Sequence, residues 1–288
     1  MKKKVAFIIL HYKNITDTIE CIESLKKINR SEESAIVVVD NNSLNNKDEE
    51  KIRNYTKDLI LLNENIGFAK GNNAGCKLAI EKYKPEFLCV INNDIVINQK
   101  DFIEEIYKCY QKTNFDIMGP KIITDGGDSV NPFPVYSNLE EVIEKINYHK
   151  KLITIYNNII LRNFLKIYLK IKHIIKRPKK MENGLESKDD IALHGCALIF
   201  SKKYYQKYED VFYPETFLYH EEEFLNYRKN KDHLISYYDK DLEVFHKEGS
   251  SLNESFNNQN YKKLIFRNKE ILKSLELFKK VLEEDQSI

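Results

Sequence analysis

The sequence predicts an α/β fold in which helices cover both faces of a mostly parallel central sheet. Two observations support this prediction. Short apolar runs without polar interruption recur along the first hundred residues, and segments of helical periodicity separate them. Uninterrupted apolar runs are typical of strands that are buried on both faces. Their alternation with helices indicates parallel strands joined by crossover helices.

Four strands and three helices are expected in the first third of the chain. Continuous apolar runs predict the strands, at residues 4–10, 35–40, 59–64 and 87–91. Four apolar residues at helical spacing predict a helix after the first strand, with Thr16 or Asp17 as its N-cap. A second helix is expected around the segment DEEKIRNY, and a third from about Asn72.

The rest of the chain carries a different pattern. ALIFSKKYY at 197–205 predicts a strand that leads into a helix, and LEVFH at 242–246 predicts a further strand. An amphipathic helix is expected from about Tyr261 to the end. We therefore expect a first half at 1–120, a second half at 121–255 with a basic helical insertion at about 138–185, and a C-terminal helix at 256–288.

Composition narrows the class of protein. The chain has 288 residues, 42% hydrophobic and 31% charged, which is enough to bury a core. Its formal charge of +2 favours no particular partner. The five cysteines include no Cys-x-x-Cys pair and lie mostly in apolar contexts, as expected of reduced residues in the cytoplasm. No signal peptide and no membrane-spanning segment are expected.

Polar residues follow all four strands of the first half, at the point where each strand ends. They are His11 and Tyr12, Asp40 to Ser43, Asn63 to Asn65, and Asn92 to Asp94. The carboxyl ends of parallel strands meet at one rim of the sheet, where ligands bind. Each group alone is explained by turn capping, which Asn, Asp and Ser favour. The coincidence of all four favours a ligand site.

The segment FLCVINNDIVIN at 87–98 interrupts an apolar run with a carboxylate. Burying a carboxylate without a partner is costly. The run is therefore either two pieces joined by a turn, or Asp94 faces a partner such as a metal ion.

The glycine loop GFAKGNNAG carries Gly67, Gly71 and Gly75 at a spacing of four. It matches neither the P-loop nor the dinucleotide-binding pattern. Its backbone amides and the helix that follows are suited to contact a phosphate group.

Seven segments together carry a resemblance to a known family. In order they are ILHYKN, VVVDNNS, NENIGFAKGNNAG, VINNDI, HGCALIFSK, FLYHEEEFLNYR and VFHKEGSS, and they span residues 5 to about 251. The chain resembles a family 2 glycosyltransferase with the Rossmann-like GT-A fold. Its segments are most similar to the rhamnosyltransferase-like branch of bacterial polysaccharide biosynthesis.

The resemblance implies a divalent metal site. NND looks like this branch's version of the DxD motif, with Asn92 in place of the first aspartate. Asp94 would coordinate Mg²⁺ or Mn²⁺, which bridges the diphosphate of the donor. His246 stands where this fold often supplies a late metal ligand, and a buried core histidine is the alternative.

The resemblance also implies a nucleotide-sugar site on the same rim. Asp40 would accept the N3–H of uracil or thymine, and His194 would contact the acceptor or the donor sugar. Lys70 is expected to be solvated rather than bound to phosphate. The remaining donor-site residues expected are His11, Tyr12, Asn42, Asn65, Gly67, Phe68, Asn72, Asn92 and Asn93.

The general base is expected in the segment HEEEF. By position it is Glu222, with Glu221 as the supporting acid and Glu223 as a third candidate. Successive residues of a helix point about 100° apart, so not all three can face one site. Without the resemblance, the three acids would be assigned to an exposed helix start favoured by the helix dipole. The family inverts the anomeric centre in one displacement, which needs no nucleophilic Ser or Cys.

Residues 145–180 carry eleven basic residues and no acidic ones, interleaved with aliphatic residues. Such a stretch suits an anionic membrane surface, and packing against protein is the alternative. Nucleic acid is disfavoured because stacking aromatic residues are few. A cytoplasmic protein, peripheral on the inner face of the membrane, is therefore expected.

The resulting hypothesis is transfer of a sugar, with rhamnose the first candidate, from a dTDP- or UDP-sugar. The acceptor would be a saccharide or a polyprenyl-linked saccharide. The alternative is an inactive sugar-nucleotide-binding or membrane-scaffold relative. A nucleotidyltransferase is disfavoured because no glycine- and basic-rich loop follows the first strand. The sequence does not specify an oligomeric state.

Overall fold

The computed structural model describes residues 3–127, 130–136, 138–164, 186–247 and 260–285. In the first half the elements are β1 (Val5–His11), α1 (Ile15–Lys26), β2 (Ser34–Asp40), α2 (Asn46–Arg53), β3 (Asp58–Leu61), α3 (Phe68–Tyr83), β4 (Phe87–Asn92), β5 (Ile95–Val96) and α4 (Phe102–Thr113). They continue with β6 (Ile117–Thr124), α5 (Leu139–Asn157), β7 (Lys188–Asp189), β8 (Ala197–Ser201), α7 (Lys202–Lys207), α8 (Glu221–Asp232), β9 (Ser236–His246) and α10 (Asn260–Asp285).

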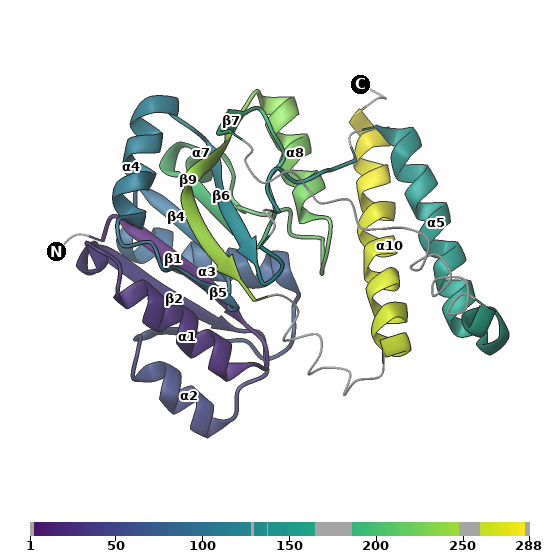
Figure 1. Ribbon diagram of the computed structural model, residues 1–288, viewed down its shortest axis with the longest axis horizontal. Coiled ribbons are helices and arrows are strands. Elements are labelled where there is room, and N and C mark those ends of the chain that lie inside the picture. The colour runs from purple at the N-terminus through teal and green to yellow at the C-terminus, as the bar shows by residue number, and fades with distance from the viewer. Residues whose placement is uncertain (1–2, 128–129, 137, 165–185, 248–259, 286–288) are drawn as a thin grey trace.

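The strands of the described residues form a single mixed sheet in the order β3-β2-β1-β4-β8-β6-β9-β5, with β7 beside β9 (Figure 1). β3, β2, β1 and β4 are mutually parallel. β8 runs antiparallel to both of its neighbours, and β6 and β9 are again parallel to each other. The predicted α/β fold with a mostly parallel sheet is confirmed.

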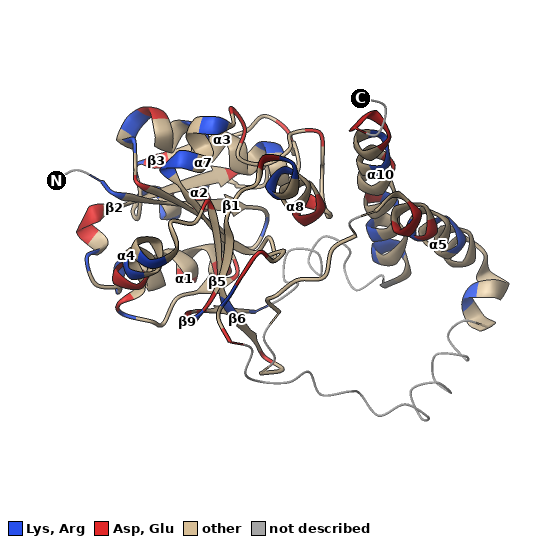
Figure 2. Cartoon of the chain, turned by 90° about the horizontal axis from the view of Figure 1, so that it is seen from above, with Lys and Arg blue, Asp and Glu red and all other residues tan. Residues whose placement is uncertain are grey.

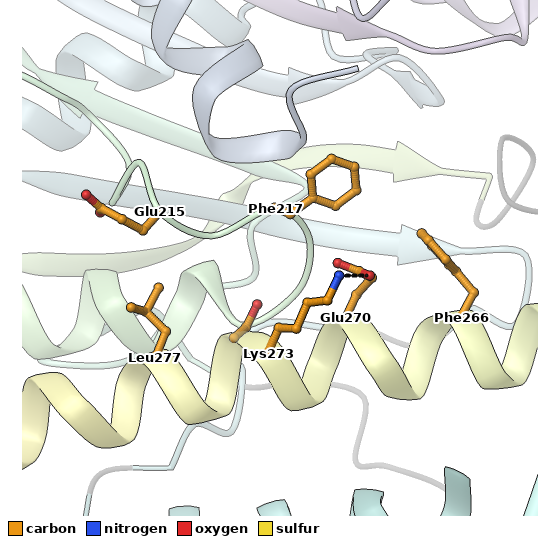
Figure 3. A pocket seen from close by; sticks show the side chains of 7 residues that line it. Glu215, Phe217, Phe266, Glu270, Lys273 and Leu277 are labelled. Atoms are coloured by element: carbon orange, nitrogen blue, oxygen red, sulfur yellow. Dashed lines mark hydrogen bonds and ion pairs between the residues drawn. The ribbon is translucent and has the colours of Figure 1, made fainter. Parts of the chain in front are cut away.

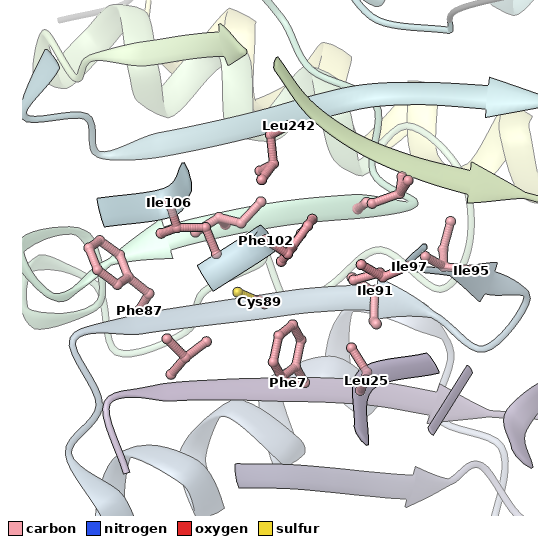
Figure 4. Close-up of a cluster of buried hydrophobic side chains, with 14 of the residues drawn as sticks. Phe7, Leu25, Phe87, Cys89, Ile91, Ile95, Ile97, Phe102, Ile106 and Leu242 are labelled. Carbon is pink, nitrogen blue, oxygen red and sulfur yellow. The ribbon is translucent and has the colours of Figure 1, made fainter. Parts of the chain in front are cut away.

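Two hydrophobic clusters cover the two faces of the sheet. Alternate residues of β1 divide between them: Phe7 packs with α1, α2 and α4, whereas Ile8 packs with α3, α7 and α8. Figure 4 shows the first cluster, in which Phe7, Cys89 and Phe102 lie close together. Burial on both faces explains why β1 is apolar without interruption.

A third cluster joins α5 and α10 to the rest of the protein. Val142 and Ile146 of α5 pack with Leu275 and Phe278 of α10 and with Phe224 of α8. The two helices lie side by side, on the α8 side of the molecule, in both Figure 1 and Figure 2. The first part of the basic stretch therefore packs on protein, while residues 165–180 lie outside the described residues.

The structure corrects two helix starts. Asn14, not Thr16 or Asp17, is the N-cap of α1, because its side chain accepts a hydrogen bond from the backbone N–H of Asp17. α3 begins at Phe68 rather than at about Asn72. Gly67 precedes it with φ of 87°, so the loop turns into the helix one residue later.

The boundary expected at residue 120 falls inside β6, which belongs to the same sheet as β1. Both halves therefore contribute strands to one sheet. Within the described part of the chain, no helix combines the length and apolar character needed to cross a membrane.

Candidate active site

The polar strand ends do meet at one rim. In the parallel register His11 lies opposite Asp40, and Leu10 lies opposite Asn92. The loop after β3 joins the same rim, since Leu62 N donates to the carbonyl of Asp40.

The loop after β2 is held by its own side chains. The carboxylate of Asp40 accepts hydrogen bonds from Ser43 N at 3.0 Å, Ser43 Oγ at 2.9 Å and Leu44 N at 3.2 Å. Asn42 stands at its tip, exposed, with φ of 59°. In this structure Asp40 therefore caps its turn. If Asp40 recognises the base of a nucleotide, its carboxylate does so in the orientation that the bonds to Ser43 and Leu44 impose.

Asn41 connects this loop to the glycine loop. Its side chain donates to Gly67 O at 3.1 Å and accepts from Ile66 N at 2.9 Å. Asn65 Oδ1 accepts from Gly67 N at 3.0 Å. These bonds fix the backbone just before α3, which brings Phe68 and Asn72 to the rim.

Gly67 also contacts a distant segment. Phe68 N donates to Phe217 O at 2.6 Å, and a Cβ on Gly67 would lie 2.4 Å from that oxygen. Only glycine fits this close approach at positive φ. Asn72 is buried, and its Oδ1 has no hydrogen-bond partner among the described residues.

His11 is fully buried and neutral. Its Nδ1 lies 2.7 Å from Thr18 Oγ1, and Thr18 gives its hydroxyl proton to Asn14 O. His11 Nε2 has no hydrogen-bond partner among the described residues. Burial lowers the pKa of His11 to about 4, in spite of the charge of Asp40. Tyr12 follows it, half-buried, with Lys13 over its ring.

Asp94 and His246 meet where β5 pairs with β9. His246 lies opposite Ile95 in the register, and its Nε2 is 3.2 Å from Asp94 Oδ1. Both residues are buried, and apart from this mutual contact neither Asp94 Oδ1 nor His246 Nδ1 has a hydrogen-bond partner within the described chain.

The pair by itself is a small ligand set. The described residues contain no group of three His, Cys, Asp or Glu that could hold a metal ion. A carboxylate and an imidazole with unpartnered atoms fit a divalent cation when substrate oxygens complete its shell. Mg²⁺ is commonly bound in this way, by one or two carboxylates and the phosphates of a substrate.

The two asparagines before Asp94 differ in their surroundings. Asn93 is buried and donates to Thr18 Oγ1 at 3.0 Å, so it joins the hydrogen bonds around His11. Asn92 is half-buried, and its backbone N–H donates to Cys196 O at 2.8 Å.

Glu222 points toward the same region from α8. Its Oε1 accepts a hydrogen bond from Gly195 N at 2.9 Å. His194, the residue before Gly195, has its ring centroid 6.3 Å from that of His246, and the two rings are tilted by 58°. Burial lowers the pKa of His194, and the proximity of Glu222 counteracts the shift. Successive contacts therefore connect four separate segments: Glu222 binds the residue after His194, His194 lies near His246, and His246 contacts Asp94.

The other two acids point elsewhere. Glu221 is 6% exposed, and burial next to Glu222 raises its pKa to about 8, so it is protonated at neutral pH. Glu223 is 2% exposed and lies 2.9 Å from His220 Nδ1. Of the three candidates, only Glu222 is both half-buried and adjacent to the histidines.

Glu221 is expected to make stability depend on pH. Its unfolded pKa is near the usual 4.5 and its folded pKa about 8, so the folded state holds the proton in between. The free energy of unfolding should fall as pH rises from 4.5 to 8, by at most about 1.4 kcal/mol per pH unit. In Glu221→Gln this part of the slope should vanish in urea unfolding curves. Glu209→Gln, the same change at an exposed position after α7, is the control and should keep it, and equal slopes in wild type and Glu221→Gln would contradict the assignment.

Several contacts of this site carried no sequence signal. Thr18 contacts His11 through its hydroxyl group, Asn41 holds the glycine loop through its side-chain amide, and Gly195 and Phe217 act through backbone groups. Such contacts depend on the approach of distant segments. Asn41, Gly195 and Phe217 stand within motifs quoted above, but the motifs did not indicate these contacts.

Comparison with known proteins agrees with this geometry. The model of the family described as Glycosyl transferase family 2 matches residues 6–209. The chain is 29% identical over 138 residues to the low-salt glycan biosynthesis hexosyltransferase Agl10 of Haloferax volcanii. This alignment covers 46% of the chain and 41% of Agl10, less than half the length of that relative.

Solved structures share the fold. Residues 1–349 of TarS from S. aureus match with a TM-score of 0.50 and 16% identity, over 92% of this chain and 65% of that one. The same TarS fragment in complex with UDP matches with a TM-score of 0.51 and 17% identity, over the same shares. These likenesses establish the GT-A fold. Since the family model spans the chain from β1 through α7, the protein belongs to glycosyl transferase family 2.

Proposed function

We propose that this glycosyltransferase moves a sugar from a uridine or thymidine diphosphate donor to a saccharide or lipid-linked saccharide, with inversion at the anomeric carbon. In this proposal Glu222 is the general base, and Asp94 and His246 hold Mg²⁺ or Mn²⁺. Rhamnose is the first candidate for the sugar, through the resemblance of the motifs.

One observation carries the proposal: a carboxylate suited to be a base stands beside a carboxylate and an imidazole suited to hold a cation. His194 lies between them, next to Gly195, which binds Glu222, and 6.3 Å from the His246 ring. A sugar bound between the two groups would have the base on one side and the leaving diphosphate on the other.

Each residue then has a defined task. Gly195 N–H orients Glu222, whose carboxylate takes the proton of the acceptor hydroxyl as that oxygen attacks C1 of the donor sugar. Glu221 stays protonated and adds no second negative charge. When bound, the cation offsets the charge that develops on the departing diphosphate. Asn72 Oδ1 and His11 Nε2 have no hydrogen-bond partner among the described residues and are assigned to contacts with the bound nucleotide sugar.

The choice of nucleotide rests on Asp40 and His11. Both stand at strand ends of the rim, and a carboxylate oxygen can accept the N3–H of uracil or thymine. The structural likeness to TarS, one of whose structures holds UDP, supports the same choice. The hexosyltransferase activity in the name of Agl10 supports a hexose or deoxyhexose as the transferred sugar.

A panel of nucleotides tests the donor site. Thermal unfolding would be followed with UDP, dTDP and GDP, each with and without Mn²⁺. A ligand that binds only the folded state raises its stability by about 2.7 kcal/mol at 100 times Kd. We expect UDP or dTDP to raise Tm in the presence of Mn²⁺ and GDP to have little effect. No shift with any nucleotide would contradict the proposed donor.

The α5 end of the molecule supports a membrane partner. Residues 159–164 form a helical segment in which Ile159, Ile160, Leu161 and Phe164 are 42–66% exposed. Arg162 lies among them, against the ring of Tyr261. Exposed apolar side chains beside basic ones are typical of helices that lie on anionic membranes.

Vesicle flotation tests this partner. We expect the protein to float with vesicles that contain phosphatidylglycerol and to stay behind with pure phosphatidylcholine. The double change Ile159→Ser and Ile160→Ser should abolish flotation, because each buried side chain contributes about 1.5–3 kcal/mol. Ile235→Ser, at another exposed isoleucine that lies just before β9, is the control. Flotation that survives the double change would contradict the assignment.

A further inference from the structure

A groove lies between α10 and the segment that precedes α8, outside the residues matched by the family model. Its volume is about 430 Å³. Figure 3 shows the side chains of α10 directed toward the segment that carries Glu215 and Phe217. The lining residues are Glu215, Phe217, Phe266, Glu270, Lys273, Ser274 and Leu277.

The groove is a separate face of α10. Phe266, Glu270 and Leu277 follow each other at steps of four and seven residues, which places them on one side of the helix. Leu275 and Phe278 belong to the cluster with α5 and α8 instead. The side of α10 that lines the groove therefore differs from the side that carries Leu275 and Phe278, and the two sides meet at Leu277, which also packs against that cluster.

The lining combines aromatic rings with hydrogen-bonding groups. Phe217 and Phe266 line the groove with aromatic rings, and Ser274 Oγ donates to Leu218 O at 3.2 Å. Glu270 is 6% exposed, and its Oε1 accepts from Lys273 Nζ at 2.7 Å. Pockets for small molecules have this composition, with apolar walls and a few placed polar groups.

The charges limit the ligand. Glu215 and Glu270 carry two negative charges against the one positive charge of Lys273, which disfavours phosphate and other anions. A neutral sugar fits, since its C–H faces pack on phenyl rings and its hydroxyls donate to carboxylates.

The groove adjoins the candidate active site through Phe217. That residue forms a wall of the groove, and its carbonyl accepts from Phe68 N of the glycine loop at 2.6 Å. Four residues later the same segment reaches Glu221 at the start of α8. A chain of sugars whose end lies at Glu222 has this groove within reach.

We propose that the groove binds saccharide units of the acceptor that lie beyond the sugar that reacts, with Phe266 and Glu270 as specificity-determining residues. This inference rests on the proposed function. It assigns acceptor recognition to α10, a part of the chain that the family model does not include.

Direct binding tests the groove without turnover. Saturation-transfer NMR would be recorded with maltotetraose, cellotetraose and chitotetraose, on wild type, Phe266→Leu and Glu270→Gln. We expect transfer to at least one tetrasaccharide in wild type, reduced at least fivefold in both variants. Glu276→Gln makes the same change on another face of α10, where Glu276 pairs with Lys150, and should keep the wild-type signal.

Two results would overturn the inference: no transfer to any tetrasaccharide, or equal transfer in Glu270→Gln and Glu276→Gln. A UDP titration of the same samples separates this failure from failure of the proposed function. Binding of UDP with Mn²⁺ but of no tetrasaccharide would contradict only the saccharide-binding role of the groove. Binding of a tetrasaccharide through Glu270 but of no nucleotide would contradict only the proposed donor.

Discussion

Glu222→Gln is expected to lower kcat about 10²–10⁴-fold, the usual contribution of a positioned general base. The amide keeps the shape of the side chain and can still accept from Gly195 N–H, but it cannot take a proton. The position of the segment around His194 should therefore be preserved. The measurement is transfer of radiolabelled sugar from the donor to acceptor material extracted from the source cells.

Two controls give this experiment its meaning. Glu209→Gln makes the same change at an exposed position after α7 and should retain wild-type turnover. UDP affinity should be nearly unchanged in Glu222→Gln, because the residue acts on the acceptor. A Glu222→Gln enzyme with kcat within threefold of wild type would rule out Glu222 as the base.

Asp94→Asn should remove the effect of Mn²⁺ on nucleotide binding. Asn has the shape of Asp but lacks the negative charge that a hard cation requires. We expect the Mn²⁺-dependent gain in UDP or dTDP affinity to fall at least tenfold, equivalent to about 1.4 kcal/mol. Transfer activity should fall with it. Calorimetric titration of the nucleotide with and without Mn²⁺ measures the change.

His246→Gln should have the same direction and a smaller effect, because an amide oxygen can still ligate a cation. Asp241→Asn, on the exposed side of β9, is the matched control and should bind as wild type does. An unchanged Mn²⁺ response in Asp94→Asn would remove Asp94 from the proposed metal site.

The fold was largely predictable because buried strands require apolar residues, and this pattern is visible within a short stretch of sequence. β1 and β4 are covered on both faces, so their residues had to be apolar without interruption, and this pattern is visible in the sequence. Helix starts were less predictable. Asn14 and Gly67 act through a side-chain bond and a positive φ, whereas Asp17 offered an equally plausible local signal.

The sequence predicted which residues belong to the candidate site, but it did not predict how they are arranged in space. The strand ends identified the rim, and the motifs named Asp94, Glu222 and His246. The sequence left three adjacent acids as candidates for the base. Their different surroundings distinguish them: Glu221 is buried and protonated, Glu223 contacts His220, and Glu222 binds Gly195.

The sequence by itself determined the α/β fold, the rim with its polar strand ends and the family, because each depends on patterns within a few dozen residues. Only the tertiary structure decided which groups meet. Asp94 and His246 are 3.2 Å apart because β5 pairs with β9, and Phe217 reaches Gly67 across about 150 residues. The tertiary structure also places one face of α10 along a groove. Helical periodicity alone does not say which partner each face meets, since that is set by how distant elements pack.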